Sequence, residues 1–251
     1  MRLAVAALVI ASVAPSAFAG ETLIYSNNVR APVTGPDGEL FRDGNFSDAL
    51  SSQGVYYRSE AFGQSFRIES DNTRLTRMTA WGASEYIEGD ISQTSLSNNI
   101  LSLEISICRI EVGNPRFPVV HSWQVSLSSI TQLNTGSIVP GILSPVFQLD
   151  MLLGNAPAFS AGDYLLTVGA VLANENGSSF AWADGEKNGS TGGVGERSYL
   201  TQGEIASQWG VWNPIVDSNS SGAVQLYGIP APGALAALLL AGSRGGRRRR
   251  D

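Results

Sequence analysis

The chain has 251 residues and a formal net charge of −6, and it contains 28 Gly, one Cys and one His. A single Cys excludes an intramolecular disulfide, and one Cys with one His excludes the clusters that hold zinc, haem pairs or iron–sulfur centres. Charged residues make up 15% of the chain, against ~25% in an average globular domain. This composition favours short strands and turns over charged amphipathic helices.

Residues 1–19 have the layout of a secretory signal peptide. Arg2 precedes an apolar run from Leu3 to Val13, and Ala17-Phe18-Ala19 forms a small-x-small cleavage site. The run is shorter than the ~20 residues that span a bilayer. We therefore expect residues 1–19 to direct export and a signal peptidase to cut after Ala19.

Residues 20–228 show a hydrophobic period of two, which indicates strands rather than helices. The expected strands are 23–26, 61–68, 75–81, 101–108, 119–127, 147–151, 164–171, 179–183 and 224–228. Long Ser-, Gly- and Asn-rich segments are expected as loops, at 27–56, 86–99, 133–145 and 184–212. Many antiparallel strands with one polar face predict an all-β domain over residues 20–228, an antiparallel β-sandwich of jelly-roll type.

No catalytic residue is predicted in this domain. His121 is expected on the apolar face of its strand with Val119, Trp123 and Val125, as a buried, hydrogen-bonded side chain. Cys108 has no CxxC partner and is expected as a small buried apolar residue. A Ser/His/Asp triad would need the single imidazole, and no nucleophile-elbow sequence is present. A glycosidase needs two carboxylates ~5 to 9.5 Å apart, and nothing in the sequence marks such a pair.

Two polar segments, 184–189 and 217–222, have oxygen-bearing side chains at alternate positions and Gly at the sixth, as a calcium loop requires. The candidate calcium ligands are Asp184, Glu186, Asn188, Asp217 and Asn219. The twelfth position, a bidentate Glu in EF-hand loops, is Gly195 in one segment and Gly228 in the other. Because the same residue types favour ordinary turns, the segments are either calcium loops or polar turns. Apart from calcium, no cofactor is expected.

Several aromatic residues are candidates for stacking on sugar rings. Trp81 and Trp182 lie in expected strands and are interpreted as core residues. Trp209 and Trp212 flank Gly210 in a loop-like segment and are harder to bury, which favours a recognition role. The candidate glycan-binding residues are Trp209, Trp212, Tyr199 and Tyr86.

Residues 229–251 combine Pro230-Ala231-Pro232, an apolar stretch from Ala234 to Ala241, and a basic end made of Arg247, Arg248, Arg249 and Arg250. This arrangement resembles the PEP-CTERM sorting signal of Gram-negative bacteria. The resemblance implies a transient stop at the inner membrane, cleavage near Pro230 to Pro232 by an exosortase-like membrane protease, and release or attachment at the cell surface. The alternative is a disordered basic tail. A nucleic-acid partner is not expected, because no aromatic residues interleave the arginines.

Between its two basic ends the body is acidic, with 10 basic against 21 acidic residues, or a net charge of about −11. Such a body repels polyanions. Four segments resemble the β-sandwich domains that often precede this sorting signal, namely 62–66, 75–82, 159–166 and 224–228. This resemblance implies architecture rather than activity.

The expected function is that of an exported, non-enzymatic protein of the cell surface or extracellular matrix, which binds extracellular polysaccharide or has a structural role. The alternative from another class is a secreted glycan-active hydrolase or lyase on the same fold. A structural coat or adhesion module without a ligand is the third interpretation.

Overall fold

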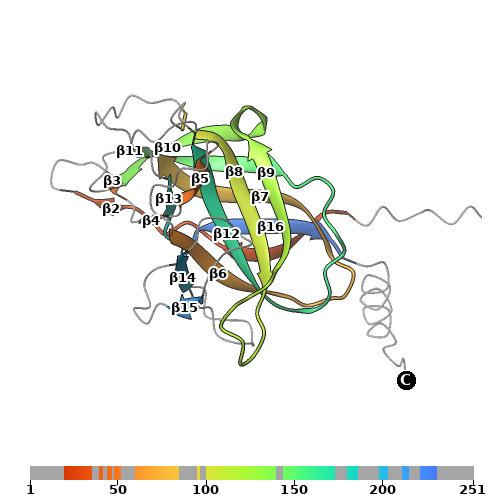
Figure 1. Cartoon of the computed structure of the whole chain (residues 1–251). Coiled ribbons are helices and arrows are strands. Elements are labelled where there is room, and N and C mark those ends of the chain that lie inside the picture. The colour runs from red at the N-terminus through yellow and green to blue at the C-terminus, as the bar shows by residue number, and fades with distance from the viewer. Residues whose placement is uncertain are drawn as a thin grey trace, which may run out of the picture.

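The structure, a computed structural model, describes residues 20–35, 40–41, 44–46, 48–51, 60–84, 95–96, 100–139, 144–172, 180–185, 198–202, 211–214 and 221–230. Every regular element in these ranges is a strand, apart from the single 3-10 turn η1 at Leu127–Ser129 (Figure 1). The prediction of an all-β body is therefore confirmed. Within the described residues no helix is long and apolar enough to cross a membrane.

The first sheet has nine strands. Seven of them follow in the order β1 (Thr22–Asn27), β16 (Val224–Ile229), β7 (Arg74–Ser84), β11 (Ser144–Leu152), β10 (Thr131–Val139), β3 (Leu40–Phe41) and β2 (Val33–Thr34). The other two lie off this path, because β13 (Phe180–Ala183) pairs with β7 and with β4 (Gly44–Phe46). All the pairings are antiparallel except that of β10 with β3. The first and last strands of the body, β1 and β16, are thus neighbours.

The second sheet has seven strands. Six follow in the order β15 (Asn213–Pro214), β14 (Ser198–Gln202), β6 (Glu60–Ile68), β12 (Gly162–Leu172), β8 (Ile100–Arg109) and β9 (Val119–Ser126). The seventh, β5 (Asp48–Ser51), pairs with β12 in parallel, whereas the other pairings are antiparallel. Among the described strands, the chain changes sheet after β4, β6, β7, β9, β11, β12, β13 and β15. Such repeated crossing is typical of two sheets that share one core.

The two sheets enclose one large hydrophobic core. The nine-stranded sheet contributes Met78, Leu149, Trp182 and Leu226, and the seven-stranded sheet contributes Phe62, Ile105, Leu166 and Val168. The ring of Phe62 meets the edge of Trp182 across the core, with centroids 5.7 Å apart and an interplanar angle of 89°. Both residues have no exposed surface. The arrangement is β-sandwich-like.

Irregular pairing shifts some residues away from the faces that strict alternation predicts. Between β8 and β9, Ile107 pairs with His121 but Cys108 pairs with Val119, so Val120 is an extra, bulged residue. Val119 therefore packs with Cys108 on the outer face rather than beside Trp123 on the inner face. The prediction that Val119 and Trp123 share one face is wrong for this reason.

Three segments expected as loops contain strands. Segment 27–56 contributes β2 to β5, segment 184–212 contributes β14, and most of β10 lies in segment 133–145. The alternation of β10 is hidden because its register shifts between Asn134 and Ile138, and Gly136 there has a φ of 74°. A bulge of this kind breaks the period of two on which the sequence prediction rests.

Candidate functional site

On the outer face of the nine-stranded sheet, side chains from the neighbouring strands β1, β16, β7 and β11 lie together. The inner face takes Leu226 of β16 and Met78 of β7 into the core. Because side chains alternate along a strand, their neighbours Tyr227 and Arg77 point to the outer face, where they are direct partners in the pairing of β16 with β7. We call this part of the sheet the outer face throughout.

One row of cross-strand partners runs over four strands of this face. Leu23 of β1 pairs with Tyr227 of β16, Tyr227 pairs with Arg77 of β7, and Arg77 pairs with Leu152 of β11. We call these four residues the Tyr227 row. The two leucines at its ends are exposed, Leu23 by 53% and Leu152 by 74%. The ring of Tyr227 and the guanidinium of Arg77 thus lie between two solvent-exposed leucine side chains.

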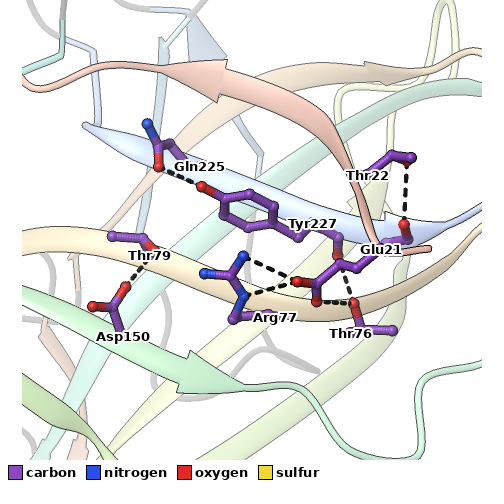
Figure 2. Close-up of polar contacts among 9 residues, drawn as sticks. Glu21, Thr22, Thr76, Arg77, Thr79, Asp150, Gln225 and Tyr227 are labelled. Carbon is purple, nitrogen blue, oxygen red and sulfur yellow. Dashed lines mark hydrogen bonds and ion pairs between the residues drawn. The ribbon is translucent and has the colours of Figure 1, made fainter.

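Arg77 is held in this row by contacts on two sides (Figure 2). Its Nη2 lies 3.0 Å from Oε2 of Glu21, and its guanidinium carbon lies 3.7 Å from the centroid of the Tyr227 ring. The hydroxyl of Thr76 donates to Oε1 of Glu21 over 2.6 Å. This hydrogen bond and the ion pair with Arg77 lower the pKa of Glu21. The same partnership raises the pKa of Arg77, so both groups are charged at neutral pH.

A second row of polar side chains lies beside the first (Figure 2). Gln225 of β16 pairs with Thr79 of β7, which pairs with Asp150 of β11. The hydroxyl of Tyr227 donates to Oε1 of Gln225 over 2.8 Å, and Thr79 donates its hydroxyl proton to Asp150. The amide of Gln148 donates to the other oxygen of Asp150 over 2.9 Å. We call Gln225, Thr79 and Asp150 the polar row.

The opposite, seven-stranded sheet has a polar outer face of its own. Gln124 donates to Ser102 over 3.0 Å, and the hydroxyl oxygens of Ser106 and Ser122 lie 2.8 Å apart. Burial raises the pKa of Glu104, although the hydroxyl of Ser106 donates to its carboxylate and opposes that shift. None of these five residues carries an aromatic ring, so they offer hydrogen-bonding groups and the carboxyl group of Glu104.

Trp212 does not have the exposed position that its sequence neighbourhood indicates. It is only 2% exposed, and its ring stacks on Phe117 with centroids 6.5 Å apart and an interplanar angle of 11°. Its backbone N–H donates to the carbonyl of Pro115, and its side chain covers Cys108 and Leu165 on the outside of the seven-stranded sheet. The expectation of an exposed sugar platform at Trp212 is therefore wrong, because a separate small hydrophobic cluster buries it.

The remaining predicted aromatic and reactive residues divide into three groups. Trp182 has no exposed surface and Trp81 is 8% exposed, which confirms both as buried. Cys108 is also buried, and burial raises the pKa of its thiol to about 12. His121 is only half-buried, with its ring edge-on to Trp123 at a centroid distance of 4.5 Å. For Tyr199 the structure describes only the backbone, in β14 opposite Gly63.

Other predicted residues can be placed only in part. Asp184 is 6% exposed, next to the end of β13, and Pro230 directly follows β16. The others lie outside the described residues, namely Ala17, Ala19, Tyr86, Glu186, Asn188, Trp209, Asp217, Asn219, Ala231, Pro232, Arg247, Arg248, Arg249 and Arg250. In the part of the chain that the structure describes, no three His, Cys, Asp or Glu side chains gather as a metal site.

Comparison of the chain with protein-family models, curated proteins and solved structures gives no significant match. The molecule is thus characterised by its own geometry, which is an all-β, β-sandwich-like fold with mainly antiparallel sheets. Sequence reasoning missed the Tyr227 row, although one signal pointed to part of it. The alternation of Val224, Gln225, Leu226 and Tyr227 puts Gln225 and Tyr227 together on the polar side of the last strand.

Proposed function

We propose that this protein is an exported, non-enzymatic β-sandwich protein of jelly-roll type that binds a neutral polysaccharide at the cell surface or in the extracellular matrix. The observation that supports binding is the Tyr227 row beside the polar row on an open sheet face. An aromatic ring and exposed aliphatic side chains favour contact with the C–H face of a sugar ring. The amide, hydroxyl and carboxylate groups of the polar row can bond to sugar hydroxyls.

The charge distribution favours a neutral ligand over an anionic one. The body has a net charge of about −11, which repels polyanions. The cation of the binding face, Arg77, already has Glu21 as its partner at 3.0 Å. An anionic polysaccharide would have to compete with that ion pair, whereas hydroxyl groups can bond to the donors and acceptors that remain.

The proposal also covers export and sorting. Residues 1–19 act as the signal peptide, and residues 229–251 act as a sorting signal that an exosortase-like protease cleaves near Pro230 to Pro232. In support, β1 begins at Thr22 and β16 ends at Ile229, and Thr22 pairs with Gly228. The two proposed cleavage points thus flank the folded body without cutting a strand of it, and they lie at the same end of the β1–β16 pair.

Binding is tested with purified protein on an array of neutral polysaccharides, with three variants of matched design. Leu152→Ser removes an exposed end of the Tyr227 row, and Tyr227→Ala removes its ring. Val120→Ser is the control, because Val120 is 46% exposed on the other sheet. We expect at least a fivefold loss of affinity for the first two variants and an unchanged affinity for Val120→Ser. Equal affinities of all four proteins would contradict the placement of the site, and no binding by any of them would contradict the proposed function.

Two further measurements test the rest of the proposal. A bound polysaccharide should keep its chain length during prolonged incubation, whereas the release of new chain ends would favour the hydrolase or lyase alternative. Mass spectrometry of surface material should show an N-terminus at Gly20 and the loss of Arg247 to Arg250. An intact arginine cluster on mature protein would refute the sorting proposal.

A further inference from the structure

Glu21, just before β1, binds two side chains of β7 at once (Figure 2). Nε and Nη2 of Arg77 each lie 3.0 Å from Oε2 of Glu21. The other carboxylate oxygen, Oε1, accepts a hydrogen bond from the hydroxyl of Thr76 over 2.6 Å. Both oxygens of Glu21 are thus bound, and the two side chains that bind them are adjacent in the sequence.

A β-bulge at Thr76 makes this double contact possible. Tyr227 pairs with Arg77 but Gly228 pairs with Leu75, so Thr76 is an extra residue without a partner in the ladder. In a regular strand, adjacent side chains point to opposite faces of the sheet, and Thr76 would point away from Arg77. The bulge instead brings the Thr76 hydroxyl to the same carboxylate as Arg77, and within 3.3 Å of the carbonyl of Tyr227. The irregularity of β7 therefore provides the clamp around Glu21.

The ring of Tyr227 holds the guanidinium of Arg77 from a second direction. The guanidinium carbon lies 3.7 Å from the ring centroid, well within the ~6 Å of a cation–π contact. A guanidinium has five N–H donors in one plane, and Glu21 engages only Nε and Nη2. Within the described residues no group accepts a hydrogen bond from Nη1, and the Arg77 side chain is 32% exposed. The row thus presents fixed N–H donors whose positive charge Glu21 already balances.

We propose that Glu21 is the specificity-determining residue of the Tyr227 row, because it holds the free N–H groups of Arg77 for the hydroxyl oxygens of a neutral sugar and excludes sulfated and carboxylated polysaccharides. This inference rests on the proposed function. The free donors on Nη1 and Nη2 lie side by side in the guanidinium plane, so they suit two adjacent oxygens of one sugar ring.

Charge explains why the same donors reject an anion. A sulfate or carboxylate group could pair with Arg77 only by competing with Glu21, and it would approach the like charge of that carboxylate. The charge of Asp150, on the neighbouring strand β11, also acts on Arg77. A hydroxyl oxygen can accept a hydrogen bond from Nη1 without displacing Glu21.

The first variant is Glu21→Gln, which keeps the shape of the side chain and removes its charge. Its affinity is measured for two probes, dextran sulfate and the neutral polysaccharide that the wild type binds most tightly on the array. We expect the affinity for dextran sulfate to rise about fivefold, because Arg77 becomes available to an anion. The affinity for the neutral polysaccharide should fall about threefold, because the guanidinium is no longer held in place. Unchanged affinities for both probes would overturn the proposal.

Asp163→Asn is the matched control for charge. Asp163 of β12 lies 3.2 Å from Arg67 of β6 on the other sheet, so this variant also removes one acid beside an arginine. Its affinities for both probes should stay within about twofold of the wild type. An equal rise for dextran sulfate in Asp163→Asn and Glu21→Gln would mean that net charge alone governs binding, and it would refute a specific role of Glu21.

The double variant Glu21→Gln, Arg77→Gln tests whether Arg77 is the group that Glu21 controls. This protein has the net charge of the wild type but lacks the released guanidinium. Its affinity for dextran sulfate should therefore return to within about twofold of the wild type. A gain that persists without Arg77 would overturn the proposed mechanism.

These measurements also separate this inference from the proposed function. If the wild type binds no neutral polysaccharide, the proposed function is wrong, and dextran sulfate alone decides the role of Glu21. An Arg77-dependent gain in Glu21→Gln then supports that role, and no gain refutes it. If the wild type binds a neutral polysaccharide but Glu21→Gln keeps the wild-type affinities for both probes, the binding function stands and the specificity role is wrong.

Discussion

The contact between Gly222 and Trp182 offers a quantitative test of how the sandwich is packed. A methyl group at position 222 would lie 2.5 Å from Cζ2 and 2.7 Å from Cδ2 of the Trp182 ring, whereas carbon atoms pack at ~3.5 to 4.0 Å. The ring would have to move by about 1 Å. It cannot move freely, because Trp182 has no exposed surface and meets Phe62 across the core.

Gly222→Ala should therefore cost about 2 kcal/mol by overpacking. A further ~1 kcal/mol is expected if the moving ring loses its hydrogen bond to Ala223. Trp182→Phe alone should also cost about 2 kcal/mol, through lost contacts and the same hydrogen bond. In the double variant the smaller ring makes room for the methyl group, so the combined cost should fall short of the sum by about 1 kcal/mol or more.

The assay is urea unfolding, followed by far-ultraviolet circular dichroism in a buffer with chelator, so that packing is measured without metal. Gly154→Ala is the control, because a Cβ at position 154 would meet nothing within 4 Å. Its free energy of unfolding should stay within ~0.5 kcal/mol of the wild type. Strictly additive costs of Gly222→Ala and Trp182→Phe, or a Gly222→Ala cost as small as that of Gly154→Ala, would refute the packing argument.

Two predictions concern ionisable groups whose pKa is raised by burial. With a thiol pKa of about 12, Cys108 should resist iodoacetamide at pH 8 in the native protein and react fully in urea, and rapid native alkylation would show that the Trp212 cluster is open. Burial raises the pKa of Glu104 in the folded protein. The contribution of Glu104 to stability is therefore full below its pKa in the unfolded chain, and it is lost as pH rises through its pKa in the folded protein. Glu104→Gln should thus be more stable than the wild type at pH 7, by about 0.5 kcal/mol after allowance for partial solvent screening, and should equal it near pH 3.5. Equal stability at both pH values in urea unfolding would contradict this.

The alternation of apolar and polar residues along the sequence predicted those strands that pair without a bulge. Segments 61–68 and 164–171 pair with each other, and 164–171 also pairs with β8, without a register shift, and the structure has β6 and β12 there. The same rule failed where a bulge adds a residue, as at Val120 and around Gly136, because a shift of one residue moves every later side chain to the other face. Such bulges depend on the partner strand, which the local pattern does not contain.

The candidate sites depend even more on distant parts of the chain. Trp212 is buried because Phe117, 95 positions earlier in the sequence, stacks on its ring. Alternation alone could assign Tyr227 to a polar face, but its contact with Arg77 requires the register of β16 on β7. Residue types therefore indicated which chemistry was available, while the long-range pairing decided which groups meet.

The pairing of β1 with β16 connects the proposed binding face with the proposed sorting signal. Leu23 and Tyr227 belong to these two strands, and β16 continues to Ile229, which pairs with Arg74 of β7. Cleavage at Pro230 to Pro232 therefore leaves the whole Tyr227 row in place, with its ring three positions before the first proline of the motif. A cut only a few residues earlier would remove Tyr227 and with it the partners of Thr22 and Leu23 in β1. Under the proposed function, β16 must stay intact after cleavage, because it carries Tyr227 of the binding row. The end of β16 therefore limits where the protease can cut.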